Sequence, residues 1–425
     1  MELAGDIAAA VERRRDDLVG LVRELVACRS ENPKLLTDAD EQEAGRAGEA
    51  ACQDVIAARL AELGMAVDRF EALTGREDVA GTLAGAGGGR SLILNGHVDV
   101  VPAGDPAGWP HDPWAGEVAD GKIWGRGSCD MKGGLAAGIG ALWALRDAGV
   151  RLRGAVVFEA VVDEEAGGPG TRAAVERGHR ADAAIVLEPT ARAIMPVEGG
   201  VVWLRVVVRG VAGHSALRYR SVHAGGRGTA VNAIEKAVKL LAAVQELERH
   251  WGNTKVHPLM PKGITTINPG MIAGGSPALS NMVDECTLWL SLKYLPSERG
   301  DDVRREFEEY MAAVAATDPW LREHPPEIEW GVDGVSFPPA ELPLEHPLAQ
   351  AVATGYRRVL GEPEWRGFEA GSDLAWLVEA GIPGLLYGPG DAAQAHGSAE
   401  YLEIDDLVAA TKVVALALIE WCGAA

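Results

Sequence analysis

The sequence predicts an α/β protein in which a sheet flanked by helices is interrupted by a second, α+β domain. Residues 1–199 alternate short apolar runs, typical of buried strands, with segments that repeat apolar residues every three or four positions. Residues 200–333 follow the order strand, helix, strand, strand, helix, strand, which fits a ferredoxin-like sandwich. Residues 334–425 return to helices around one apolar strand, so we expect them to complete the first domain.

The expected elements follow from periodicity along the chain. In residues 1–199 we expect helices at 7–28, 43–64 and 131–148, and strands at 67–70, 79–83, 92–94, 155–162 and 183–187. In residues 200–333 we expect strands at 201–209, 263–272, 283–295 and 327–332, and helices at 229–250 and 301–316. In residues 334–425 we expect helices at 347–359 and 404–422, and a strand at 384–387.

Composition narrows the class of protein. A chain of 425 residues with 47% apolar residues can form two globular domains. Its net charge of −22 argues against nucleic acid or an anionic membrane as partner. The five cysteines form no C-x-x-C pair, and the N-terminus lacks a basic segment before an apolar run. We therefore expect a cytoplasmic protein, while the net charge says little about a small substrate.

Acidic and histidine residues follow the predicted strands. The strand at 92–94 leads into Gly96-His97-Val98-Asp99, and residues i and i+2 of a strand share a face. Asp99 can therefore orient His97 as a metal ligand. Glycines flank Asp130, whose carboxylate can bridge two cations.

Three acids in a row, Asp163-Glu164-Glu165, come directly after a buried strand. Burying such a cluster is costly unless cations neutralise it. Glu188 ends another apolar strand, and His396 lies in a small polar segment near the C-terminus. In parallel sheets, sites form at the carboxyl ends of strands, so these residues predict a two-metal hydrolase site.

Five segments resemble the motifs of one dinuclear zinc hydrolase family, which includes acetylornithine deacetylase, succinyl-diaminopimelate desuccinylase, aminoacylase and glutamate carboxypeptidase. The five segments occur in the family's order, and the resemblance runs from about residue 15 to 415. They are His97-Val98-Asp99, Gly127-Ser128-Cys129-Asp130-Met131-Lys132-Gly133, Asp163-Glu164-Glu165, Glu188-Pro189-Thr190 and Ala395-His396-Gly397. The resemblance implies a phosphorylase/hydrolase-like mixed sheet flanked by helices, with an inserted ferredoxin-like lid and dimerisation domain.

The resemblance also implies roles for these residues. His97 and Glu188 would bind one zinc, Glu165 and His396 the other, and Asp130 would bridge them. Glu164 would be the general base, Asp99 would orient His97, and the peptide bond after Asp130 would be cis. Cobalt or manganese would also suit these ligands.

Further residues resemble the family's substrate contacts. The Gly213-His214-Ser215 segment is similar to a lid motif whose histidine stabilises the oxyanion in the neighbouring subunit of a homodimer, which gives His214 that role. Asn281 matches a lid asparagine, and Gly371-Ser372 match a glycine-rich loop near the substrate. Lys293 stands where several relatives have an arginine for the substrate carboxylate, and lysine is a point charge rather than a bidentate fork.

The expected function is hydrolysis of an amide in an N-acyl amino acid or related N-acylated small molecule, as in acetylornithine deacetylase. A succinyl-diaminopimelate-like desuccinylase and a dipeptidase or carboxypeptidase are the alternatives within the family. From other classes, a non-catalytic metal-binding protein and a two-metal phosphoesterase remain. An intact Glu164 argues against the non-catalytic protein, which needs no base beside its metals.

Overall fold

The computed structural model describes residues 2–223 and 230–425, which form two compact units. Unit 1 comprises residues 1–197, 340–368 and 372–425, and unit 2 comprises residues 198–339 and 369–371. The expected boundaries at 199/200 and 333/334 therefore differ slightly from those observed. The later boundary shifts because β15 (Ser336–Phe337) still pairs with β9 (Gly200–Arg209) of unit 2.

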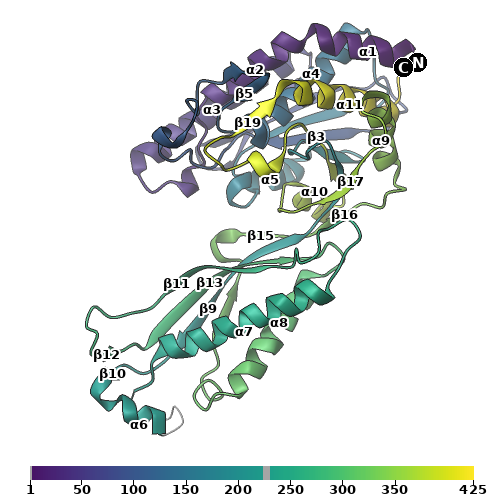
Figure 1. The fold of residues 1–425 in the computed structure, drawn as a ribbon. Helices are drawn as coiled ribbons and strands as arrows, with labels where there is room; N and C mark the ends of the chain where they lie inside the picture. Colours follow the sequence, from purple (N-terminus) through teal and green to yellow (C-terminus); the bar gives the residue numbers. More distant parts are fainter. Residues whose placement is uncertain (1, 224–229) are drawn as a thin grey trace. The chain divides into compact units, whose positions relative to one another are not determined.

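Unit 1 is built on a nine-stranded mixed sheet (Figure 1). Its order is β1-β2-β6-β3-β7-β18-β8-β16, with β17 paired to β8. The central strands β6, β3, β7 and β18 are parallel, while β1, β2 and β8 pair antiparallel with their neighbours. The strands of this sheet are β1 Ala66–Leu73, β2 Arg76–Leu83, β3 Leu92–His97, β6 Val156–Val161, β7 Ala184–Val186, β8 Ile194–Glu198, β16 Ala340–Glu341, β17 Trp365–Phe368 and β18 Gly384–Leu386.

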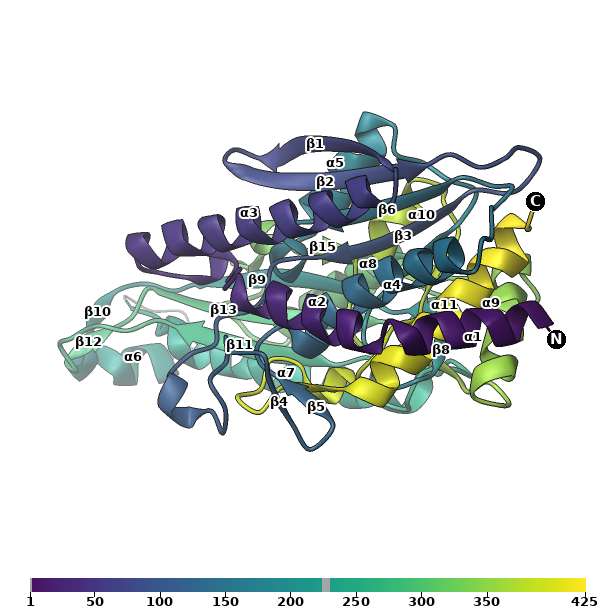
Figure 2. The same ribbon diagram turned by 90° about the horizontal axis from the view of Figure 1, so that it is seen from above.

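Helices cover both faces of this sheet. Helices α1, α2, α4, α9 and α11 pack together on one side, and Figure 2 shows α1 and α2 in line beside α4 and α11. Helices α5 and α10 contact each other on the opposite side. The helices are α1 Glu2–Arg13, α2 Arg15–Ala27, α3 Ala39–Glu62, α4 Gly133–Asp147, α5 Pro169–Arg177, α9 Pro347–Val359, α10 Leu374–Glu379 and α11 Ile404–Cys422.

Close packing brings α4 onto the ends of the central strands. A Cβ at Gly134 would lie 1.9 Å from the main-chain oxygen of Leu187, so only glycine allows this approach. A small three-stranded sheet pairs residues 401–403, near the C-terminus, with the hairpin formed by residues 117–124. Its strands are β4 Glu117–Ala119, β5 Lys122–Trp124 and β19 Tyr401–Glu403.

Unit 2 contains a five-stranded antiparallel sheet with the strand order β11-β13-β9-β14, and β15 pairs with β9. Its own apolar core lies between this sheet and two long helices, α7 and α8. This is the strand arrangement expected for a ferredoxin-like sandwich. The remaining elements are β10 Gly213–His214, α6 Arg218–His223, α7 Ala233–Thr254, β11 Ile267–Ala273, β12 Asn281–Met282, β13 Glu285–Tyr294, α8 Gly300–Ala316 and β14 Glu327–Trp330.

Two expected helices differ from those observed. The segment 7–28 is divided at Arg14, which leaves the helical conformation and pairs with Asp147 of α4. The helix expected at 131–148 begins only at Gly133, because the chain before it forms an irregular turn around Asp130. The peptide bond between Asp130 and Met131 is cis, as the resemblance predicted. Among the described residues, no helix combines the length and apolarity that a membrane crossing requires.

Candidate active site

The predicted ligands gather at one edge of the nine-stranded sheet. His97 is the last residue of β3, Glu164 and Glu165 follow β6, and Glu188 follows β7. These three strands are parallel neighbours and are buried over their whole length. Asn95 and Glu159 are buried polar residues within β3 and β6. The predicted ligands lie at or just after the strand ends, so they share the carboxyl edge of the sheet.

Asp130 reaches this edge from the turn before α4. Gly127 has a φ of 79° at the start of this turn, and a Cβ there would lie 2.6 Å from Val100 Cγ1. Glycine is therefore needed for the chain to reverse at this point. His396 comes from the segment after β18, so the site combines residues from the first range of unit 1, 1–197, and from its last range, 372–425.

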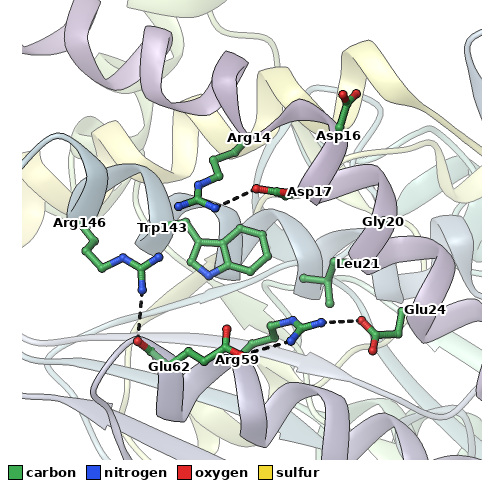
Figure 3. A pocket seen from close by; sticks show the side chains of 10 residues that line it. All are labelled: Arg14, Asp16, Asp17, Gly20, Leu21, Glu24, Arg59, Glu62, Trp143 and Arg146. Atoms are coloured by element: carbon green, nitrogen blue, oxygen red, sulfur yellow. Dashed lines mark hydrogen bonds and ion pairs between the residues drawn. The ribbon is translucent and has the colours of Figure 1, made fainter.

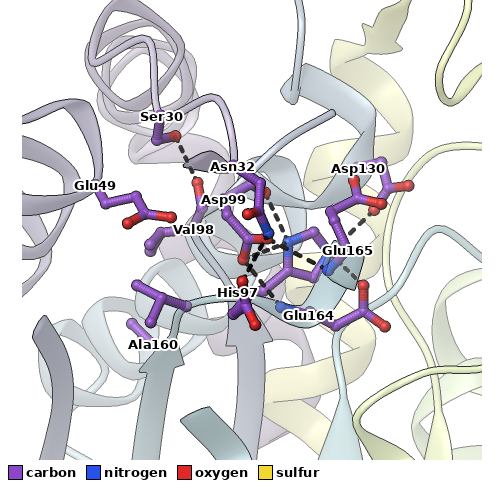
Figure 4. A network of polar contacts seen from close by, with 12 residues as sticks. Ser30, Asn32, Glu49, His97, Val98, Asp99, Asp130, Ala160, Glu164 and Glu165 are labelled. Carbon is purple, nitrogen blue, oxygen red and sulfur yellow. Dashed lines mark hydrogen bonds and ion pairs between the residues drawn. The ribbon is translucent and has the colours of Figure 1, made fainter. Parts of the chain in front are cut away.

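The side chains converge on two histidines. His97 Nε2 lies 3.3 Å from Asp130 Oδ1 and 3.7 Å from Glu188 Oε1. The same nitrogen lies 3.8 Å from Glu164 Oε2. His396 Nε2 lies 3.5 Å from Asp130 Oδ2 and 3.1 Å from Glu165 Oε2. Asp130 therefore presents one carboxylate oxygen to each histidine, an arrangement that suits a bridging ligand. Figure 4 shows Asp130 and Glu165 beside His97.

Burial makes this cluster electrostatically costly. Burial raises the pKa of the Glu164 and Glu188 carboxyl groups well above the usual range, and it also raises that of Glu165. Burial opposes a charge on His97, but the hydrogen bond with Asp130 and the nearby carboxylates outweigh it and raise the His97 pKa. Hydrogen bonds to Asp130 and Glu165 raise the pKa of His396 to about 10. The raised pKa values therefore favour protonated histidines and neutral carboxyl groups when no metal is bound, which lowers the negative charge of the cluster.

The donors suit a divalent metal ion in either of two overlapping groups, both of which contain His97. Two groups, His97 with Glu164 and Glu188, and His97 with Asp130 and Glu165, each have their ligand atoms within 4.8 Å of one another. Glu165 Oε1 is buried and has no hydrogen-bond partner among the residues that the structure describes. Buried carboxylates need a compensating charge, and imidazole with carboxylate oxygens suits zinc and related ions.

Asp99 contacts the site differently from the prediction. His97 Nδ1 makes its 2.8 Å contact with the main-chain oxygen of Asp99, and the carboxylate is 3.7 Å away. The chain leaves the strand after His97, which turns this carbonyl toward the imidazole. The Asp99 carboxylate instead accepts the main-chain N–H groups of Glu164 and Glu165, at 3.2 and 3.3 Å. It thereby holds the turn that carries both glutamates.

A network of buried charged residues also contacts the turn that carries Glu164 and Glu165. Asp163 is fully buried, has a φ of 69° and pairs with Arg76 and Lys34. Arg76 also forms a two-point contact with the buried Glu49. Asn32 Nδ2 donates to Asp99 at 2.7 Å (Figure 4) and to Asp163 at 3.2 Å. The three consecutive acids thus serve different purposes, because Asp163 faces the protein and its two neighbours face the cluster.

The remaining predicted residues divide between the two units. His214 and Asn281 lie directly opposite each other in the β10–β12 ladder of unit 2. In the same unit, Lys293 Nζ donates to the main-chain oxygen of Glu369, at 3.0 Å, and Gly371 packs against Phe337. Ser372 belongs to unit 1, where its buried hydroxyl accepts the main-chain N–H of Leu374 at the start of α10. Their substrate roles stay predictions.

Sequence reasoning missed the residues that support the ligands. Asn32, Arg76, Arg126 and Glu400 are all buried polar or charged residues that contact the ligand-bearing segments. Arg126 and Glu400 each lie four residues from a predicted ligand, Asp130 and His396 respectively. The available signal was a charged residue among small neighbours, as in Gly125-Arg126-Gly127 and Ser398-Ala399-Glu400, which indicates a specific partner for the charge.

A cavity of about 560 Å³ lies elsewhere in unit 1, beside α2, α3 and α4 (Figure 3). Four of its charged side chains form ion pairs with one another: Arg14 with Asp17, and Arg59 with Glu24. It also contains none of the predicted ligands. We therefore place the chemistry at the sheet edge.

Two histidines, of which His97 is buried and His396 is half exposed, meet largely buried carboxylates at the carboxyl edge of a mixed α/β sheet, which is typical of a metal-dependent hydrolase. Residues 93–420 match the model of Peptidase family M20/M25/M40, and the chain belongs to this family. The predicted family, fold class and activity on amide bonds are confirmed.

Two relatives and one solved structure extend this result. The chain is 38% identical to N-formyl-4-amino-5-aminomethyl-2-methylpyrimidine deformylase of Halalkalibacterium halodurans, covering 98% of this chain and 97% of the relative. It is 35% identical to the Bacillus subtilis protein of the same name, covering 97% and 96%. Its fold is similar to the aminopeptidase PepT of Bacillus cereus, with a TM-score of 0.72, 20% identity and coverage of 96% and 98%.

Proposed function

We propose that this enzyme removes the formyl group from an N-formylated aminomethylpyrimidine, releasing formate and a primary amine. The observation that carries this proposal is the similarity, along nearly the whole chain, to two relatives named as deformylases of such a compound. The proposal narrows the predicted acetylornithine-deacetylase-like activity to a smaller acyl group and a heteroaromatic amine. It keeps the same bond type, the amide of an N-acylated small molecule.

The catalytic steps use residues of the candidate site. We assign His97 and Glu188 to one cation, Glu165 and His396 to the other, and Asp130 to both. Two bound zinc ions would polarise the amide carbonyl and the attacking water. Glu164 takes a proton from that water and delivers it to the nitrogen of the leaving amine, while Asp99 fixes the turn on which Glu164 lies.

The surroundings of Lys293 favour a substrate without a free α-carboxylate. An N-acyl amino acid carries such a carboxylate, which several relatives bind with an arginine. Lys293 stands at that position in this chain, and its ammonium group donates to the main-chain oxygen of Glu369. Replacing formyl by acetyl adds one methylene-sized group, and exclusion of such a group changes kcat/KM by about 10–200-fold. We therefore expect formyl to be preferred over acetyl and succinyl.

A substrate panel tests the proposal. The zinc-loaded enzyme is incubated with the N-formyl, N-acetyl and N-succinyl forms of 4-amino-5-aminomethyl-2-methylpyrimidine, and the released amine is measured. We expect kcat/KM for the formyl compound to exceed that for the acetyl compound by about 10-fold or more. Cobalt- and manganese-loaded samples of the same preparation identify the metal that supports the highest rate.

Comparison substrates separate the alternatives. Faster release from N-acetylornithine, N-succinyl-diaminopimelate or a dipeptide would replace the deformylase proposal by another activity of the same family. Turnover of nitrophenyl phosphate alone would instead indicate a phosphoesterase. No turnover of any compound by a protein with two bound metals would favour the non-catalytic alternative.

We also propose that the protein is a cytoplasmic homodimer that associates through unit 2. Strand β11 lies at an edge of the unit 2 sheet and pairs only with β13 among the described strands. It exposes half of Met271 and half of Ile272, and exposed apolar edge strands are sites of association. All five cysteines are free thiols, which supports a reducing compartment. Sedimentation of the wild type and Ile272→Lys tests the dimer, which the lysine should dissociate.

His214 is proposed as an oxyanion donor. Its Nδ1 accepts the main-chain N–H of Ala216 at 3.1 Å, so the proton of the neutral ring lies on Nε2, where it can be donated. His214→Ala should lower kcat by about 10²–10³-fold, the usual cost of losing one oxyanion donor. Unchanged kcat in this variant would remove the role.

Mixed dimers test whether His214 acts across the subunit interface. A heterodimer of His214→Ala and Glu164→Gln chains contains one active site with both wild-type groups only if His214 is supplied by the partner. We therefore expect activity to return when the two inactive variants are unfolded together and refolded. No recovery, with mixed dimers demonstrated, would place His214 in the site of its own subunit.

A further inference from the structure

A buried ion pair, Arg126 with Glu400, joins two segments that carry predicted metal ligands. Arg126 precedes Asp130 by four residues, and Glu400 follows His396 by four. Both side chains are almost fully buried, with exposed fractions of 2% and 0%. The segments are also joined by the pairing of β5 with β19, in which Trp124 lies opposite Tyr401.

Glu400 holds the main chain at Asp130. Its Oε1 accepts the N–H groups of both Cys129, at 3.0 Å, and Asp130, at 3.2 Å. Its Oε2 pairs with Arg126 Nη1 at 2.5 Å. One carboxylate therefore determines both the position and the direction of the backbone from which the Asp130 side chain extends.

Arg126 connects the same pair to His396. Its Nη2 donates to the main-chain oxygen of His396 at 3.2 Å. The His396 side chain is half exposed, and its backbone has a φ of 63°, so this residue has less support from packing than the other ligands. The guanidinium thus ties a comparatively exposed ligand to the buried turn that carries Asp130.

Stability alone gives a weak reason for this pair. Removing two charges from water costs about as much as their mutual attraction returns, and apolar replacements of buried pairs are often neutral. The contacts of this pair end on the main chain of Asp130 and His396, whose side chains lie 3.5 Å apart. The pair is therefore placed to control the separation of these two groups.

We propose that Arg126 and Glu400 are positioning residues which hold Asp130 and His396 at the separation that the metal ions require. Neither side chain is assigned as a ligand. Loss of such outer partners typically lowers metal affinity by about 10–100-fold. The inference uses the ligand assignment given above, but its readout is metal binding and does not depend on which acyl group the enzyme removes.

Two conservative variants separate the contacts. Arg126→Lys retains a positive charge beside Glu400 but loses the second arm that reaches His396. Glu400→Gln retains an oxygen for the N–H groups of Cys129 and Asp130 but places an amide against the guanidinium. We expect Arg126→Lys to weaken chiefly the ion bound by His396 and Glu165, and Glu400→Gln to weaken both.

Zinc and cobalt affinities are measured by competition with a chelator, together with thermal unfolding of the metal-free proteins. Arg14→Lys is the matched control, because Arg14 pairs with Asp147 away from the site. We expect metal affinity to fall about 10–100-fold in the two variants and to stay unchanged in the control.

If Arg126 and Glu400 only stabilise the fold, their variants should unfold at lower temperature without losing metal affinity. Metal affinities equal to the wild type in both folded variants would overturn the proposal, whatever their unfolding temperatures. If Glu400→Gln does not fold, Arg126→Lys alone decides, because it keeps the charge pair. Two metals bound by the wild type, shown first, separate a failure of this inference from a failure of the ligand assignment.

Discussion

Replacing Glu164 by glutamine is expected to lower kcat by about 10²–10⁴-fold, the usual contribution of a general base, with little change in KM. Glutamine has nearly the shape of glutamate but cannot accept a proton from water. The Asp99 carboxylate still holds the main chain of this residue, so the turn should keep its position. Steady-state kinetics of the zinc-loaded variant measure the effect.

The neighbouring glutamate supplies the matched control for this prediction. Glu165 faces His396 at 3.1 Å, whereas Glu164 lies 3.8 Å from His97. Glu165→Gln should therefore lose metal, while Glu164→Gln should retain both ions. If Glu164→Gln loses an ion instead, Glu164 is a ligand, and another group must act as the base.

Much of this site could be predicted from the sequence because the strands that carry it are mostly apolar. β3, β6 and β7 are buried throughout, with Asn95 and Glu159 as the polar exceptions, and His97, Asp163 and Glu188 lie at or just after the strand ends. Parallel pairing then brings their ends together without further information. His396 follows no such strand directly, and only its motif predicted its place.

The supporting contacts could not be predicted in the same way. Arg126 and Glu400 are 274 residues apart, and Arg76 and Asp163 are 87 apart. The sequence contains 40 basic and 62 acidic residues, so pairing of one with another depends on the folded chain. The expected contact between the Asp99 carboxylate and His97 differs for a related reason. The strand ends at His97, so the side chains of His97 and Asp99 need not share a face, and the main-chain oxygen of Asp99 makes the shorter contact.

Metal affinity is expected to rise steeply with pH. In the metal-free protein His396 has a pKa of about 10, because Asp130 and Glu165 hydrogen-bond to it, and burial raises the pKa of Glu165 and Glu188. A cation can bind only after these protons leave. Each displaced proton changes the apparent affinity by about tenfold per pH unit, because one pKa unit corresponds to about 1.36 kcal/mol.

The stability of the metal-free protein should change in the opposite direction. A histidine whose folded pKa is raised contributes stability that is complete below its unfolded pKa of about 6.5 and is lost as the pH rises through the folded value. For His396 that loss extends toward pH 10. The raised pKa values of the Glu165 and Glu188 carboxyl groups change stability in the same direction, because these groups also lose stabilising protons as the pH rises. Zinc replaces these protons, so the difference in unfolding temperature between loaded and metal-free protein should widen as pH rises.

Thermal unfolding of both forms at several pH values measures this difference. At a free zinc concentration one hundred times Kd, the loaded protein should be more stable by about 2.7 kcal/mol. An Asp130→Ala control should show little difference at any pH, because we assign that carboxylate to both metal ions. A constant difference across the pH range would mean that the histidines and glutamates of the metal-free site are not protonated. The acids would then have to be compensated by groups other than His97 and His396.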